Sequence, residues 1–119
     1  MKRELARRWA KALDSGDYKQ GTGQLRKAGK FCCLAVLCNL HAEDHPEIAA
    51  KQKRASEYMG EAELLPDAVR EWAGMTNEDG GFYGYDGVDT YTALTDLNDD
   101  QKLTFPEIAK VIRKHYKEL

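Results

Sequence analysis

The sequence has no long hydrophobic run. Its longest uninterrupted apolar stretch covers residues 31–38, whereas a helix that spans a membrane needs about 20 apolar residues. The first eight residues are rich in charge, and no apolar signal segment follows them. We therefore expect neither a membrane partner nor secretion.

Cysteine is also scarce. The chain has three cysteines, an odd number, and two of them, Cys32 and Cys33, are adjacent. This argues against a framework of disulfides. It is typical of a protein from a reducing compartment, so we expect a cytoplasmic location.

The apolar stretch and its extension to Leu40 form the predicted central element, residues 31–40. A segment that is apolar on every side has to be buried on every side. The spacing of its leucines suits a helix from about Cys33, entered by an extended segment at Lys30 and Phe31. A chain of 119 residues can bury roughly two-thirds of its unfolded surface, so we expect a single domain over residues 1–119.

Around this element the sequence predicts an α+β domain with four to five helices and a small antiparallel sheet. Apolar periodicity, capping residues and turn residues predict helices at 3–14, 46–56, 65–74, 91–98 and 105–117. Similar signals predict a hairpin turn at 27–30, a short strand at 58–62, and a hairpin or ordered loop at 76–90.

The net charge of −2 hides an asymmetry between the two halves of the chain. Residues 1–54 carry twelve Lys and Arg against six Asp and Glu, and residues 55–119 carry six against fourteen. We expect the halves to neutralise each other. The alternative is a strong dipole that steers the protein onto a charged partner. The basic helix at 3–14 is interpreted as an amphipathic helix docked by Trp9, and we do not expect nucleic-acid binding.

Cys32 and Cys33 allow one enzymatic alternative. A helix N-terminus can lower a thiol pKa, and Gln20 could donate a hydrogen bond to an oxyanion. None of the three histidines, His41, His45 and His115, stands in a context that would position it as the base. We favour cysteines in the core, and a cysteine-dependent hydrolase or transferase remains an alternative.

Residues 96–107 match much of an EF-hand calcium loop. The oxygen ligands would be Asp96, Asn98, Asp100, the carbonyl of Lys102, and Glu107. Gln101 stands where the loop needs glycine for its sharp turn, and no second loop exists to pair with this one. Thr104 and Glu107 also form a capping box, which explains the same residues without a metal. We favour the helix cap, and a single EF-hand-like calcium module remains an alternative.

The sequence contains three weaker patterns. His41 and His45 stand four residues apart, but Pro46 and the lack of a third ligand argue against a metal site. The Gly21–Thr22–Gly23 segment matches neither phosphate-loop pattern. A helix-turn-helix at 94–112 would bind nucleic acid through four exposed cations, Lys110, Arg113, Lys114 and Lys117. The neighbouring helix is acidic and would repel phosphate, which argues against this function. We therefore assign no catalytic, cofactor or metal residues.

Three segments together resemble a family of small, uncharacterised phage and prophage proteins. They are Tyr18-Lys-Gln-Gly-Thr-Gly-Gln-Leu-Arg26 with Phe31-Cys-Cys-Leu-Ala-Val-Leu-Cys38, then Tyr58-Met-Gly-Glu61 with 65–74, and lastly 94–112. In that family the core run commonly reads Cys-Cys-Leu-Gly-Val-Leu, so Ala35 is a small departure. Its last segment resembles Leu-Asn-Asp, a turn, and Thr-Phe-x-x-Ile-Ala. The resemblance implies a phage accessory origin and supports Thr104 as a helix cap, and it supplies no activity.

From these observations we expect a small cytoplasmic accessory protein of phage type. It would act by binding a host or phage macromolecule, with a protein as the expected partner.

Overall fold

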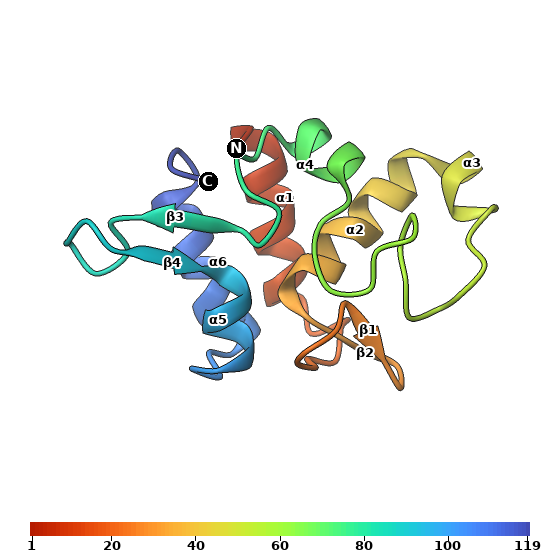
Figure 1. The fold of residues 1–119 in the computed structure, drawn as a ribbon, viewed down its shortest axis with the longest axis horizontal. Helices are drawn as coiled ribbons and strands as arrows, with labels where there is room; N and C mark the ends of the chain where they lie inside the picture. Colours follow the sequence, from red (N-terminus) through yellow and green to blue (C-terminus); the bar gives the residue numbers. More distant parts are fainter.

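The computed structural model describes residues 1–119 and shows an α+β fold with six helices and two separate antiparallel sheets of two strands each (Figure 1). In chain order the elements are α1 (Arg3–Asp14), β1 (Arg26–Lys27), β2 (Lys30–Phe31), α2 (Cys33–Asp44), α3 (Pro46–Ala49), α4 (Asp67–Ala73), β3 (Gly81–Tyr83), β4 (Tyr91–Ala93), α5 (Leu94–Asp99) and α6 (Phe105–His115). The predicted fold class is confirmed. The expectation of one sheet is wrong, because each short hairpin pairs only with itself.

Helix α2 is the centre of the fold, as predicted. Every residue from Cys33 to Cys38 is buried, and α1, α4 and α5 pack against this helix. The indole Nε1 of Trp9 donates a hydrogen bond of 2.9 Å to the carbonyl oxygen of Cys33, which fixes α1 to the first turn of α2. One cluster of 27 buried hydrophobic residues includes members of α1, α2, α4, α5 and α6. None of these helices is long and apolar enough to cross a membrane.

Helices α1 and α6 pack against each other more extensively than any other pair of elements. Helix α1 has the predicted bounds, and Gly16 follows it with a φ of +79°, a conformation that glycine adopts without strain. Helix α6 begins with the predicted capping box at Thr104 and ends at His115, two residues earlier than expected.

The hairpin of β1 and β2 also follows the prediction. Its turn residues, Ala28 and Gly29, both have positive φ, which matches the twist of a two-residue hairpin. The preceding loop lies directly against β2, because the Gly21 amide donates to the Phe31 carbonyl at 2.7 Å. A Cβ at Gly21 would lie 2.8 Å from the Lys30 Cβ, so this close approach requires glycine.

Two predicted elements after α2 are wrong in extent. The helix expected over 46–56 ends at Ala49, because the sequence that follows has no apolar face to bury, and a series of turns takes its place. The strand expected at 58–62 is a tight turn, in which Tyr58 and Glu61 exchange backbone hydrogen bonds of 2.8 and 3.0 Å.

The helix predicted at 91–98 is also wrong in its first part. Its first three residues form β4, which pairs with β3 in the register Gly81–Ala93, Phe82–Thr92 and Tyr83–Tyr91. Tyrosine and threonine favour strands, and here the cross-strand pairs outweigh the local helical pattern. The rest of the segment forms α5. The β3–β4 hairpin projects from one end of the molecule (Figure 1).

Candidate functional site

The cysteines of the central helix are packed in the core. Cys32 is 4% exposed and Cys33 is fully buried, and the Cys33 Sγ lies 3.7 Å from the Leu94 carbonyl oxygen. Burial raises the pKa of Cys32 to about 11 and that of Cys33 well above its ordinary value. The loss of hydration therefore outweighs the field of the helix N-terminus, and both thiols are protonated at neutral pH.

Gln20 points to a structural contact and not to the cysteines. Its Nε2 donates to Asn98 Oδ1 at 2.9 Å and to the Leu103 carbonyl at 2.7 Å, and its Oε1 accepts from the Phe105 amide at 3.1 Å. These bonds hold the loop before β1 against the corner between α5 and α6. The structure thus gives the enzymatic alternative neither an activated nucleophile nor its oxyanion donor.

The residues of the EF-hand match do not surround a common point. Asp96 and Asn98 lie within α5, and the buried Asn98 Nδ2 donates to the Gly21 carbonyl at 2.9 Å. The Glu107 carboxylate accepts hydrogen bonds from the Thr104 amide and hydroxyl, each 3.0 Å long. No group of three His, Cys, Asp or Glu side chains is arranged to hold a metal ion.

In the helix-turn-helix pattern, too, one of the residues expected to contact a ligand is used within the fold. Lys110, Arg113 and Lys114 are exposed on α6, but the Arg113 guanidinium donates to Asp14 at 2.6 Å and so links α6 to α1. Helix α5 has only six residues and carries the acidic Asp96 and Asp99.

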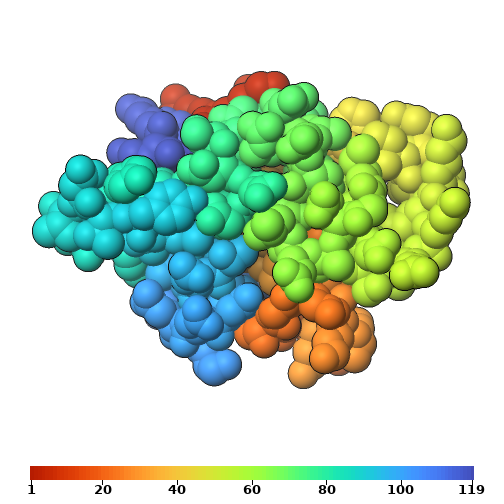
Figure 2. Space-filling model, in the orientation of Figure 1, coloured from red at the N-terminus to blue at the C-terminus, as the bar shows by residue number.

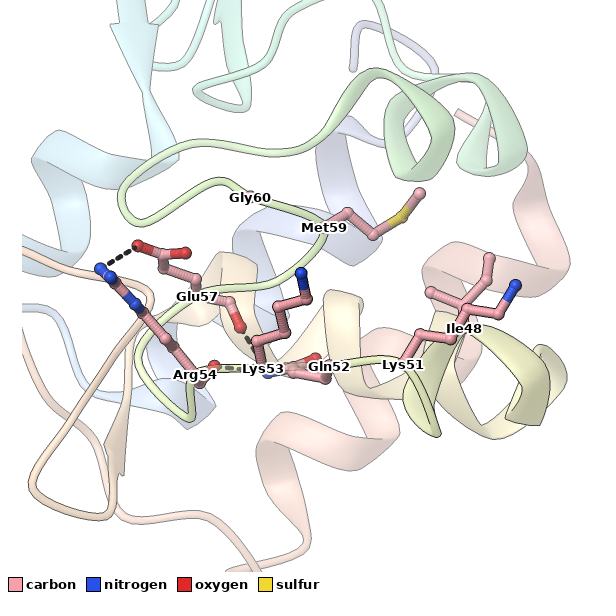
Figure 3. A pocket seen from close by; sticks show the side chains of 8 residues that line it. All are labelled: Ile48, Lys51, Gln52, Lys53, Arg54, Glu57, Met59 and Gly60. Carbon is pink, nitrogen blue, oxygen red and sulfur yellow. Dashed lines mark hydrogen bonds and ion pairs between the residues drawn. The ribbon is translucent and has the colours of Figure 1, made fainter.

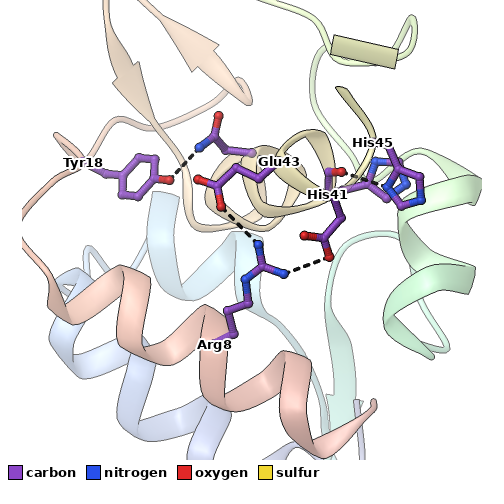
Figure 4. A network of polar contacts seen from close by, with 7 residues as sticks. Arg8, Tyr18, His41, Glu43 and His45 are labelled. Atoms are coloured by element: carbon purple, nitrogen blue, oxygen red, sulfur yellow. Dashed lines mark hydrogen bonds and ion pairs between the residues drawn. The ribbon is translucent and has the colours of Figure 1, made fainter. Parts of the chain in front are cut away.

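His41 and His45 form a stacked pair beside a network around Arg8 (Figure 4). The His41 Nδ1 and the Tyr58 hydroxyl share a hydrogen bond of 2.6 Å, and the His45 Nδ1 donates to the His41 carbonyl at 2.9 Å. The ring of Trp72 meets His41 edge to face at 5.0 Å. Burial lowers the pKa of His41. The pair therefore anchors the end of α2, and its Nδ1 atoms are not free for a metal.

Direct ion pairs between the two halves of the chain are few: Arg54 pairs with Glu57, and Arg113 pairs with Asp14. Of the twelve lysines and arginines in residues 1–54, Arg8 and Arg54 are the only ones that form ion pairs. Both carboxylates that bind Arg8, from Glu43 and Asp44, belong to the same half (Figure 4). Ten cations therefore remain unpaired, and several of them gather where the chain forms open cavities.

Six cations form what we call the cationic surface: Arg26, Lys27 and Lys30 of the β1–β2 hairpin, and Lys51, Lys53 and Arg54 of the segment after α3. Figure 2 shows the orange hairpin directly against the light-green segment that contains residue 62, and the Leu25 amide donates to the Ala62 carbonyl at 2.7 Å. Arg26 and Lys27 of the hairpin line one open cavity together with Ala55 and Ser56, so the hairpin lies beside the segment after α3.

Arg26 is the central residue of this surface. Its guanidinium carbon lies 5.2 Å from the centre of the Phe31 ring, a cation–π contact that holds the side chain across the hairpin. Its Nε is buried without a hydrogen-bond partner, and the guanidinium forms no ion pair. The residue lines an open cavity of about 480 Å³ together with Lys27, Phe31 and Ser56.

The chain between Ile48 and Gly60 lines a second cavity of about 430 Å³. Figure 3 shows Arg54 and Glu57 paired at one end, Ile48 and Met59 at the other, and Lys53 between them. Met59 is 43% exposed, which is unusual for so large an apolar side chain. The site therefore combines unpaired positive charge with accessible apolar surface.

Sequence reasoning found this surface only in outline. The basic excess of residues 1–54 is the available signal, and it does not single out these six cations. The sequence does not indicate the place of Lys53 and Arg54, because the structure has turns where it predicts a helix over 46–56.

Comparison with known proteins adds a family and no activity. A family model described as a domain of unknown function, DUF8296, matches residues 1–116. No curated protein and no solved structure matches the chain.

Proposed function

The chain belongs to the DUF8296 family, and we propose that it is a small accessory protein that binds an acidic protein partner through the cationic surface. The observation that carries this proposal is Arg26, a partly exposed residue whose guanidinium has no counterion within its own chain. The guanidinium carries a full charge without an ion pair, and a partner carboxylate that contacts its accessible nitrogens would supply the missing counterion. The planar guanidinium suits a carboxylate better than a lysine ammonium would.

The apolar residues that line the two cavities favour a protein as the partner. Phe31, Ile48 and Met59 add apolar contact area to the two cavities, and arginine, methionine and aromatic residues are enriched at protein interfaces. Acidic side chains with apolar neighbours would complement both properties at once.

Nucleic acid fits this surface less well. The strands of the β1–β2 hairpin have two residues each, so the surface offers neither a helix nor a long ribbon for a groove. The fourteen acids of residues 55–119 would also repel a long polyanion.

We also propose a phage accessory role in a cytoplasmic setting. The resemblance of the three segments to phage and prophage proteins supports the first part. The three free and buried cysteines support the second, because reduced thiols persist in that compartment.

A titration with a labelled peptide of alternating glutamate and leucine tests the proposed chemistry at about 150 mM salt. The double variant Lys27→Glu/Lys53→Glu should weaken peptide binding at least tenfold, because two attractive contacts become repulsive. The variant Lys117→Glu makes a matched change on an exposed lysine outside the surface and should bind as the parent protein does. Affinity capture from lysate with the same three proteins then identifies the natural partner.

Two outcomes would contradict the proposal. One is equal peptide binding by the parent and by Lys27→Glu/Lys53→Glu, or no binding by either. The other is a sub-micromolar complex with duplex DNA at the same salt concentration, which would identify nucleic acid as the ligand.

A further inference from the structure

A second group of cations, three of them unpaired, lines a groove between α1 and α6, on elements that take no part in the cationic surface. The groove has a volume of about 520 Å³, and its lining is Arg3, Ala6, Arg7, Lys11, Arg113 and Tyr116. Four of these six residues are cationic, and none is acidic. The size falls within the range of pockets that hold small ligands.

The α1 side of the groove is electrostatically unfavourable without a ligand. Arg3, Arg7 and Lys11 are four residues apart, which places them above one another on one face of the helix. Like charges at this spacing destabilise a helix. None of the three forms an ion pair, although Glu4 belongs to the same helix.

The α6 side supplies a fixed cation and an aromatic ring. Arg113 donates to Asp14 at 2.6 Å, and this contact holds its guanidinium at the groove. Asp14 is thus the one acid paired with a groove cation, and it leaves Arg3, Arg7 and Lys11 without compensation. Tyr116 is partly buried and offers both a ring face and a hydroxyl group.

We propose that the α1–α6 groove binds the oligophosphate group of a small ligand. The three cations of α1 extend along about 12 Å of helix, at ~1.5 Å per residue, so they match several adjacent negative charges and not a single one. Arginine binds phosphate oxygens through paired N–H groups. The oligophosphate can belong to a nucleotide or to inorganic polyphosphate, and Tyr116 provides a contact that only a nucleotide would use.

The test is calorimetric titration of the full chain with inorganic triphosphate, ATP and orthophosphate at about 150 mM salt. We expect triphosphate and ATP to bind and orthophosphate to bind at least tenfold more weakly. Tighter binding of ATP than of triphosphate would identify a nucleotide as the natural class. Equal binding of the two would identify the phosphate chain alone as the recognised group.

Variants then locate the site. Arg7→Gln and Lys11→Gln should each weaken triphosphate binding by about tenfold, which is the loss of one charge-assisted hydrogen bond at an exposed position. Both residues are exposed, so these variants should fold, and without ligand their melting temperatures should equal or exceed that of the parent. Lys27→Gln, a change in the cationic surface, should leave triphosphate binding unchanged.

Three results would overturn this proposal: no heat of binding with either triphosphate or ATP, equal affinity for orthophosphate, or unchanged affinity in both Arg7→Gln and Lys11→Gln. The proposed function stands or falls separately, because Arg7→Gln should retain binding of the acidic peptide.

Discussion

Gln20 and Asn98 are 78 positions apart in the chain, and the Gln20 Nε2 donates a hydrogen bond of 2.9 Å to the Asn98 Oδ1. Asn98 completes the link by donating to the carbonyl of Gly21, also at 2.9 Å. Asn98 is fully buried, and this pair holds the loop before the β1–β2 hairpin against α5. The position of Arg26 and its neighbours therefore depends on a polar contact at the other end of the chain.

The first prediction tests this contact. Asn98→Ala should lower the free energy of unfolding by about 1–3 kcal/mol, because Gln20 and Gly21 lose buried hydrogen-bond partners. Gln20→Ala should be destabilising as well, and the double variant should cost less than the sum of the two. Urea unfolding of the four proteins gives the coupling. Gln101→Ala, an exposed neighbour, is the control. Strictly additive losses would show that the two side chains act independently.

Several parts of the fold could be predicted from local sequence because their cause is local. The central helix follows from an apolar stretch that has to be buried, and the β1–β2 turn follows from Ala28–Gly29. The capping box at Thr104 and Glu107 needs only four residues. In each case the residues that determine the structure lie next to one another in the chain.

The errors arose where residues elsewhere in the chain determine the local structure. Tyr91 and Thr92 form a strand because they pair with β3, which begins ten residues before β4 in the chain. The segment after Ala49 leaves the helix and runs beside the β1–β2 hairpin, where Leu25 binds the carbonyl of Ala62. The candidate site lies at this junction, so sequence reasoning could find its charge but not its geometry.

The second prediction concerns the thiols. Native protein should react slowly with iodoacetamide near neutral pH, because burial raises the pKa of Cys32 to about 11 and leaves almost no thiolate. All three cysteines should react rapidly in denaturant, which is the control. Cys33→Ala should cost roughly 1–3 kcal/mol through the cavity that it leaves. Rapid labelling of Cys32 in the native state would restore the cysteine-dependent enzyme as an interpretation.

The third prediction distinguishes the helix cap from a calcium site. Thr104→Ala should lower stability by about 1 kcal/mol, because the Glu107 amide loses its acceptor. The loss should be the same with and without millimolar calcium, as measured by thermal unfolding. A ligand that binds only the native state must raise its melting temperature. A calcium-dependent rise that disappears in Glu107→Gln would therefore contradict the cap as the sole role of this segment.

The last prediction concerns His41 and acid. Burial lowers the pKa of His41 below its ordinary value of 6.5, so the unfolded chain binds a proton at a pH where the folded chain does not. Stability should consequently fall as the pH drops from about 7 to 5, since protonation favours the unfolded state. Asp44 and Glu107, whose pKa values are lowered by hydrogen bonds from Arg8 and Thr104, lose their contributions only at lower pH.

Two variants separate the proton effect of His41 from its hydrogen bond to Tyr58. His41→Gln keeps a polar partner for the Tyr58 hydroxyl and cannot be protonated, so the decline in unfolding free energy between about pH 7 and 5 should become shallower. Tyr58→Phe removes the hydrogen bond and leaves the imidazole buried, so it should lower stability at every pH while the decline persists. Urea unfolding at a series of pH values measures both. An unchanged decline in His41→Gln would assign the acid sensitivity to another group.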